Sequence, residues 1–317
     1  MTDRRIPVGI LGATGVVGQR LVRLLDGHPW FRLAEIAASE RSAGRSYADA
    51  ADWRLPGPIP QASATLPVCE IDAPFESPLL LSALTSEAAD IAEPLHASRG
   101  NLVISNAGRF RMDPRVPLVV PEVNPEAIDM VGRQEWAPGG LITNPNCMVV
   151  GLVMALAPIH REWGVRRATV TSFQALSGAG YPGVPSLAAI GNVLPFISRS
   201  EEEKIGAEPL KILGARSQVC AARGADSRGA DFPISAAAHR VPVLDGHLAS
   251  VRLDLEAEAV DLREVGRRLR DFRGVPQDLR LPSAPEKPIV LHSAPDRPQP
   301  ALDAGLGNGM SVSVGRL

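Results

Sequence analysis

The chain has 317 residues, long enough for two domains, and 45% of them are hydrophobic but only 4% aromatic, so few rings are available to stack nucleic-acid bases. A formal net charge of −2 excludes the global basic field that a polyanion would need, and no apolar run reaches the roughly 18 residues of a membrane span. The three cysteines form no CxxC pair, which argues against disulfides and structural zinc and favours a reducing, cytoplasmic setting.

The first half of the chain reads as short apolar strands joined by helices. The pattern predicts a strand at 6–11, a glycine turn, a helix from residue 16 to about residue 25, and a second strand at 31–39. Two further apolar runs, at 78–84 and 101–107, end in small polar residues, as strands of a parallel sheet commonly do. This succession indicates a Rossmann-type parallel sheet.

The second half has a different pattern. Residues 117–128 are broken by prolines and predict an irregular crossing, and 139–147 mark a domain boundary. The later elements expected are a buried apolar helix at 148–159, strands at 166–176, 231–243 and 247–258, an exposed loop at 214–231, an amphipathic helix at 261–272, an extended proline-rich stretch at 282–309 and a last strand within 310–317.

We therefore expect an α/β protein of two domains. A Rossmann-type parallel-sheet domain is assigned to 1–146 and is completed by 302–317. An α+β catalytic and dimerisation domain with a mixed or antiparallel sheet is assigned to 147–301.

The glycine turn GATGVVG follows the first strand and opens the first helix. It is GxxGxxG, not the usual GxGxxG, but its glycines still permit a tight turn and close backbone approach to a pyrophosphate at the helix N-terminus. A turn that serves packing alone is the alternative. The residues expected to face a dinucleotide here are Gly12, Thr14, Gly15, Val16 and Val17.

The end of the second strand bears on the choice of dinucleotide. Ser39, Arg41 and Ser42 offer hydroxyls and a guanidinium, which suit a 2′-phosphate and favour NADP. Glu40 lies among them and suits a ribose hydroxyl, so the stretch alone leaves NAD open.

Cys147, in TNPNC, stands at the start of the apolar helix. The helix dipole stabilises a thiolate there and lowers its pKa, which is the activation that a cysteine nucleophile needs, and the amide of Asn146 is a candidate oxyanion donor. A buried small residue is the alternative interpretation, and we give it to Cys69 and Cys220. Of six histidines, His247 follows a turn and is the candidate acid/base.

These stretches, with SNAGRFRMDPRVPLVVPEVNPE, FQALSGAGYPGVPS, EEEKI, RVPVLDGH, DRPQP and GMSVSVGR, run in order along nearly the whole chain. The sequence resembles the aspartate-semialdehyde dehydrogenase family, in particular its archaeal and fungal branch. The resemblance implies NADP-dependent reduction of L-aspartyl 4-phosphate to L-aspartate 4-semialdehyde, a step of lysine, threonine and methionine biosynthesis. It also implies a homodimer or homotetramer that binds a small-molecule substrate and phosphate, with no metal, nucleic acid or membrane.

The resemblance also implies roles for individual residues. Cys147 would be the nucleophile, His247 the acid/base and Gln174 the residue that orients the intermediate. The substrate-binding residues would be Arg240 for the α-carboxylate, Glu201 and Lys204 for the amino group and phosphate, and Arg111 for phosphate, beside Asn146. Further cofactor contacts would be Ser82, Asn106, Ser177, Gly178 and Asn308.

Three features depart from the family pattern. Met148 replaces a small hydroxyl residue, His239 stands where asparagine is common, and the 214–231 segment has no counterpart. They keep two alternatives open: a malonyl-CoA reductase of the same architecture, and a non-catalytic NADP-binding paralogue. Glu201, Lys204 and Arg240 favour an aminoacyl phosphate, and the retained Cys147 and His247 argue against a paralogue.

Overall fold

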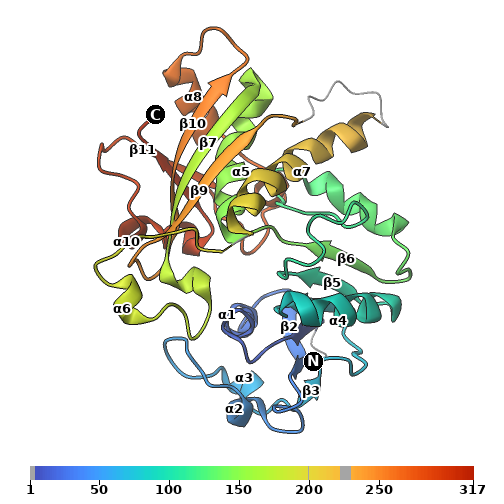
Figure 1. Cartoon of the computed structure of the whole chain (residues 1–317). Coiled ribbons are helices and arrows are strands. Elements are labelled where there is room, and N and C mark those ends of the chain that lie inside the picture. The colour runs from blue at the N-terminus through green and yellow to red at the C-terminus, as the bar shows by residue number, and fades with distance from the viewer. Residues whose placement is uncertain (1–3, 199, 222–229) are drawn as a thin grey trace. The chain divides into compact units, whose positions relative to one another are not determined.

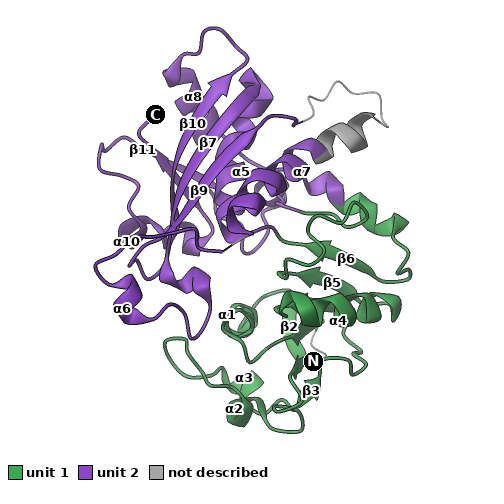
Figure 2. Ribbon diagram, viewed as in Figure 1, with its two compact units in different colours: residues 1–118, 128–144 green, residues 119–127, 145–317 purple. Residues whose placement is uncertain are grey.

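A computed structural model describes residues 4–198, 200–221 and 230–317 (Figure 1). The chain divides into two compact units (Figure 2). Unit 1 comprises residues 1–118 and 128–144, and unit 2 comprises residues 119–127 and 145–317. Within the described residues, no helix is both long and apolar enough to cross a membrane.

Unit 1 is built on a six-stranded parallel sheet with strand order β3-β2-β1-β4-β5-β6. This confirms the expected Rossmann-type sheet. The strands are β1 (Ile6–Leu11), β2 (Phe31–Ala38), β3 (Val68–Glu70), β4 (Leu79–Ser82), β5 (Leu102–Ser105) and β6 (Gly140–Thr143). The helices are α1 (Val16–Leu25), α2 (Tyr47–Ala50), α3 (Gln61–Ala64) and α4 (Ser86–Ser98), with the 3₁₀ helix η1 (Pro125–Arg133) at the segment shared with unit 2.

Alternate side chains of β1 pack into two different clusters. Val8 and Ile10 pack with Val22 of α1, whereas Leu11 joins Leu80 in a second buried cluster. Because β1 lies between β2 and β4, the connection that follows it is where the strand order reverses. Ligands of such sheets bind at this switch point, and here it is occupied by the glycine turn.

Unit 2 contains a mixed four-stranded sheet in the order β10-β7-β9-β8, as the sequence predicts. Its strands are β7 (Val165–Gln174), β8 (Leu194–Pro195), β9 (Ile234–Arg240) and β10 (Leu248–Leu255). β7 pairs antiparallel with β10 and parallel with β9 (Figure 1). The register sets Gln174 opposite Arg240 and Phe173 opposite Leu248, so the last residues of β7 and β9 meet the first residue of β10.

The helices of unit 2 surround this sheet. They are α5 (Cys147–Trp163), α6 (Ser186–Ala189), α7 (Glu201–Ala221), α8 (Leu262–Arg270), α9 (Val275–Asp278) and α10 (Pro300–Asp303), with 3₁₀ helices η2 (Leu176–Ala179) and η3 (Leu306–Gly309). α5 is apolar along most of its length and packs against α7, α8 and β7. β11 (Ile289–His292) and β12 (Val312–Gly315) form a separate parallel pair.

Three expectations differ from the structure. Residues 302–317 belong to unit 2 and do not complete the first domain, because β12 pairs with β11 and not with the six-stranded sheet. The expected loop at 214–231 is helical up to Ala221, since α7 continues through Gly214. Residues 222–229 of that loop lie outside the described part of the chain. The proline-rich stretch 282–309 also contains β11, α10 and η3 in place of a wholly extended chain.

Candidate active site

The glycine turn of unit 1 is shaped for close backbone approach. Gly12 has φ +81°, and a Cβ on it would lie 2.8 Å from the carbonyl oxygen of Ala83. A Cβ on Gly18 would lie 2.2 Å from the carbonyl oxygen of Gly12. Gly15 is the N-cap of α1 and supplies no side chain to bond the first helical N–H groups. The turn therefore fits a pyrophosphate, which would accept those N–H groups at the positive end of the helix.

The residues expected to distinguish NADP from NAD follow β2 directly. Ser39 and Arg41 are exposed, and the N–H of Ser42 donates to the carbonyl oxygen of Ser39 at 2.8 Å, which closes a turn. A cation and two hydroxyls thus stand at the carboxyl end of the strand, where a ribose 2′-phosphate is bound in this fold.

The carboxyl ends of β4 and β5 are held by a buried carboxyl group. The hydroxyls of Ser82 and Ser105 donate to Oε1 of Glu93 at 2.6 and 2.5 Å, and burial raises the pKa of that carboxyl. The hydroxyl of Ser82 is therefore engaged inside the sheet, so a cofactor contact by Ser82 would have to use its backbone. Asn106 accepts from the amide of Asn144 at 2.8 Å, and its carbonyl accepts from Arg111 at 2.7 Å.

Cys147 is the first residue of α5. Its neighbour Asn146 caps the helix, because Oδ1 of Asn146 accepts the N–H of Met148 at 2.8 Å. The thiol of Cys147 is exposed and stands at the positive end of a 17-residue helix. That position stabilises a thiolate, as the sequence predicts.

His247 contacts the sulfur of Cys147. Its Nε2 lies 3.1 Å from Sγ, while its Nδ1 accepts the backbone N–H of Ala175 at 3.0 Å. Because Nδ1 is an acceptor, the proton of the neutral ring is on Nε2 and points toward the sulfur. Burial lowers the pKa of His247, and the positive charge of Arg240 lowers it further, although Glu201 and Asp245 act in the opposite direction.

Arg240 ends β9 beside this pair. Its Nη1 donates to the carbonyl oxygen of Ala175 at 2.6 Å, and its side chain is buried, with 4% relative exposure. Among the described residues, its Nε has no hydrogen-bond acceptor. A Cβ on Gly178 would lie 2.8 Å from Nη1 of Arg240 and 2.9 Å from Cε1 of His247. Because residue 178 is glycine, the space beside the guanidinium of Arg240 stays open. Within the part of the chain that the structure describes, the Nε of that guanidinium has no acceptor.

Glu201 joins three segments of the site. Its carboxylate accepts from Nε2 of Gln174 at 2.8 Å and from Nδ2 of Asn146 at 3.0 and 3.2 Å. The amide nitrogens of both residues are therefore engaged within the protein, and the side chain of Asn146 does not stand free as an oxyanion donor. Glu202 instead accepts the N–H of Ala238, which distinguishes the neighbouring glutamates.

The other predicted residues of unit 2 lie on several different elements. Lys204 is half-buried on α7, Ser177 is in η2, and Asn308 is in η3 with φ +58°. The two departures are also placed: Met148 is buried, and His239 stacks on Phe173. Within the described residues, no group of three or more His, Cys, Asp or Glu side chains is placed to hold a metal ion.

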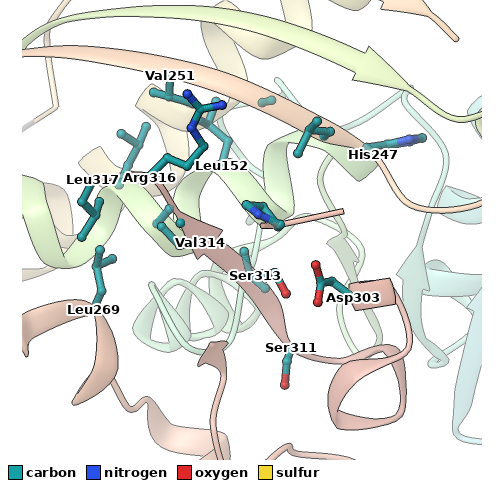
Figure 3. Close-up of a pocket in the computed structure, with 18 of the residues that line it drawn as sticks. Leu152, His247, Val251, Leu269, Asp303, Ser311, Ser313, Val314, Arg316 and Leu317 are labelled. Carbon is teal, nitrogen blue, oxygen red and sulfur yellow. The ribbon is translucent and has the colours of Figure 1, made fainter. Parts of the chain in front are cut away.

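A cavity of about 690 Å³ in unit 2 opens beside Cys147 and His247. α5 and β10 contribute apolar side chains to it, among them Leu152 and Val251, and β12 contributes Ser313 and Val314 (Figure 3). Asp303 of α10 also lines this cavity (Figure 3). The cysteine–histidine pair is therefore accessible from a mainly apolar hollow.

Sequence reasoning missed two contributors to the site. The N–H of Ala175 sets the proton position of His247, and Glu208 accepts the backbone N–H of Asn146 at 2.6 Å. Ala175 lies within the FQALSG stretch but contributes only a backbone N–H, and Glu208 lies outside the quoted motifs. The spacing of seven residues between Glu201 and Glu208 on one helix was the available signal for the second.

A dinucleotide-type glycine turn on a parallel sheet, together with a cysteine activated at a helix N-terminus beside a histidine, defines a cysteine-dependent dehydrogenase. Residues 7–131 match the family model described as semialdehyde dehydrogenase, NAD binding domain, and residues 156–317 match semialdehyde dehydrogenase, dimerisation domain. The chain belongs to the aspartate-semialdehyde dehydrogenase family, in the branch with archaeal and fungal members, which confirms the resemblance.

Relatives of the chain are similar over almost its whole length. The aspartate-semialdehyde dehydrogenase of Methanothermobacter thermautotrophicus is 44% identical, covering 98% of this chain and 89% of that protein. The enzyme of Cryptococcus neoformans is 42% identical, covering 99% and 88%. The crystal structure of the Candida albicans enzyme with NADP has a TM-score of 0.87 at 36% identity, covering 98% of this chain and 89% of that one.

Proposed function

We propose that the protein is an NADP-dependent enzyme that converts L-aspartyl 4-phosphate to L-aspartate 4-semialdehyde and phosphate, in amino-acid biosynthesis. The observation that carries the proposal is the 3.1 Å contact between Nε2 of His247 and Sγ of Cys147 at the N-terminus of α5. The named relatives are aspartate-semialdehyde dehydrogenases, which supports this substrate.

Cys147 begins the reaction. Its thiolate attacks the acyl carbon of the substrate, the carbonyl oxygen becomes an oxyanion, and collapse of the tetrahedral species expels phosphate and leaves a thioester on Sγ. The Nε2–H of His247, which points toward Sγ, and the positive end of α5 would stabilise this oxyanion. In neutral His247 the Nδ1 atom can accept the N–H of Ala175, and this hydrogen bond orients the ring with its Nε2 proton toward the sulfur.

NADPH supplies the hydride when it is bound. On the protein, the thioester carbonyl becomes a thiohemiacetal oxyanion, which His247 stabilises through the proton on Nε2. Return of the electron pair re-forms the carbonyl, breaks the C–S bond, releases the aldehyde and leaves the thiolate of Cys147. The proton stays on Nε2 throughout these steps, so neutral His247 acts in them as a hydrogen-bond donor to each oxyanion.

Substrate recognition is assigned to four charged residues. We assign the α-carboxylate to Arg240, whose buried Nε lacks an acceptor among the described residues. Glu201 and Lys204 on α7 are assigned to the amino group and phosphate, and Arg111 to phosphate. Gln174 orients the intermediate while Glu201 holds its amide.

Most cofactor contacts are assigned to unit 1, and three are assigned to unit 2. Gly12, Thr14 and Gly15, with the first residues of α1, Val16 and Val17, would hold the pyrophosphate. Ser39, Arg41 and Ser42 would hold the 2′-phosphate of NADP. The remaining cofactor contacts are assigned to Ser82, through its backbone, and to Asn106, Ser177, Gly178 and Asn308.

Assembly and location are also part of the proposal. The match of residues 156–317 to a dimerisation domain supports an oligomer. We propose a homodimer, either alone or as half of a homotetramer. A catalytic thiol requires a reducing compartment, which supports the cytoplasm.

Phosphate-dependent reduction of NADP by aspartate semialdehyde tests the activity directly. The assay is run beside NAD and beside malonate semialdehyde with CoA, which tests the malonyl-CoA reductase alternative. Turnover that depends on phosphate and prefers NADP is expected. Turnover only with malonate semialdehyde and CoA would replace the proposal, and dinucleotide binding without turnover of either substrate would indicate a paralogue.

A further inference from the structure

One face of α7 buries two glutamates that alternate with two isoleucines. Glu201, Ile205, Glu208 and Ile212 recur at intervals of four, three and four residues, which places them on a single stripe of the helix. All four are buried, and Glu208 has only 1% relative exposure. Burying a carboxyl group in such a stripe costs free energy unless hydrogen-bond donors contact it, so its hydrogen-bond partners indicate its role.

Both glutamates bond the same residue, the one that precedes the nucleophile. Oε2 of Glu208 accepts the backbone N–H of Asn146 at 2.6 Å. The carboxylate of Glu201 accepts the side-chain amide of Asn146 at 3.0 and 3.2 Å. α7 therefore holds Asn146 by its main chain and by its side chain, and α7 packs along α5, which begins at the next residue.

We propose that Glu208 is a positioning residue for Cys147. It fixes the peptide that leads into the sulfur-bearing residue, and so sets the place of Sγ against His247. The proposal rests on Cys147 being the nucleophile of the proposed function.

The two partners of the reactive contact are held by different hydrogen bonds. The ring of His247 is fixed by the N–H of Ala175, which lies at the end of β7, whereas the turn before Cys147 is fixed by α7. Loss of the Glu208 contact would free one partner while the other remained in place. A displacement of about 1 Å between reacting groups is enough to lower a rate by about a hundredfold.

A matched set of variants separates positioning from stability. Glu208→Gln keeps a carbonyl acceptor at the same reach, Glu208→Asp withdraws the carboxylate by one methylene, and Glu208→Ala removes it. Glu202→Ala is the control. Glu202 lies on the same helix as Glu208 and also accepts a backbone N–H, at 3.0 Å, but that N–H belongs to Ala238 of β9.

For each variant, three quantities are measured: kcat and KM for NADP, the melting temperature, and the rate at which iodoacetamide alkylates the Cys147 peptide, followed by mass spectrometry. We expect Glu208→Ala and Glu208→Asp to lower kcat and the alkylation rate by about tenfold or more, with KM for NADP within about twofold. Glu208→Gln is expected to restore both rates to within about threefold of the parent chain. Glu202→Ala should lower the melting temperature without a comparable loss of either rate.

The proposal is overturned if folded Glu208→Asp alkylates and turns over like the parent chain, or if Glu208→Gln loses as much as Glu208→Asp. If Glu208→Ala does not fold, the Asp and Gln variants carry the same comparison. Alkylation needs neither the acyl substrate nor NADP. A changed alkylation rate in a protein without aspartate-semialdehyde activity would therefore support the positioning role while rejecting the proposed function.

Discussion

Replacing Cys147 by serine changes one atom at the start of α5. Serine keeps the helix start and the hydrogen-bonding capacity but has no thiolate, so we expect kcat to fall by about a thousandfold or more. The glycine turn lies on unit 1 and is untouched, so the dissociation constant for NADPH, measured by fluorescence, should stay within about threefold of the parent value. Full turnover by the serine variant would contradict the nucleophile assignment.

The pH dependence follows from His247. Burial, and then the charge of Arg240, lower its pKa below the ordinary value of about 6.5. As the pH falls through the lowered pKa, Nδ1 gains a proton and can no longer accept the N–H of Ala175. We expect kcat/KM to fall on the acid side with a midpoint below about 6.5. The sign for stability is the same, because the unfolded chain takes up this proton first as the pH decreases.

An NMR titration of the imidazole resonances checks that expectation without the assay. His247→Asn identifies the signal by its disappearance. A midpoint above about 6.5 would mean that burial and Arg240 do not dominate the environment of the ring.

At the scale of single residues, the sequence predicted the position of functional groups that is set by their immediate neighbours in the chain. TNPNC places Cys147 at a helix start by its own proline and asparagine, and the structure has the helix begin there. The contacts of Ala175 and Glu208 could not be predicted this way. They join residues 72 and 62 positions apart, and one partner in each is a backbone N–H that carries no sequence signature.

Gly18 tests how β1 and α1 meet. A methyl group there would lie 2.2 Å from the carbonyl oxygen of Gly12 and 2.7 Å from Cα of Ala13, both rigid backbone atoms. We expect Gly18→Ala to cost about 1–3 kcal/mol of stability and to weaken NADPH binding, measured by urea unfolding and by titration. Gly132→Ala, where nothing lies within 4 Å, is the control and should be near neutral. Equal effects of the two variants would contradict the packing argument.

At the scale of elements, the pattern of apolar residues predicted the strands and helices that bury a distinctly apolar surface. The strands β1, β2, β4 and β5 and the helix α5 were expected, because each is a continuous apolar run. β3 has only three residues, and β6 lies in the 139–147 stretch that was interpreted as a domain boundary; both are strands because they add to an existing sheet. The end of α7 was mistaken for a loop because of its glycine and small residues, yet Ile205 and Ile212 anchor the helix that continues into it.

For the whole molecule, association is the property most open to measurement. Unit 2 exposes large apolar side chains, including Leu187 at 95% and Leu244 at 79%, which favour burial against a second copy. We expect light scattering to give twice the chain mass of 33.6 kDa, and Leu187→Glu to shift the mass toward one chain. Ile91→Glu, at an apolar position of unit 1 that is 75% exposed, is the control. A lower mass for the Ile91 variant alone would place the interface elsewhere.

The division of the chain into two units was predicted, but one of its pieces was misplaced. The alternation of residues 310–317 identifies a strand without naming its partner, and β12 pairs with β11 in unit 2. Strand pairing over this distance depends on where the intervening proline-rich segment runs. Local periodicity contains no information on that path.

Cys147, His247, Gln174, Glu201 and Arg240 all reside in one unit, and the glycine turn resides in the other. The residues proposed to form the thioester and the glycine turn proposed to bind the dinucleotide thus come from separate parts of the chain. An electrophile that mimics an activated ester should label the thiol in nucleotide-free protein, and exchange of unit 1 for another dinucleotide module would leave that esterase-like half-reaction intact.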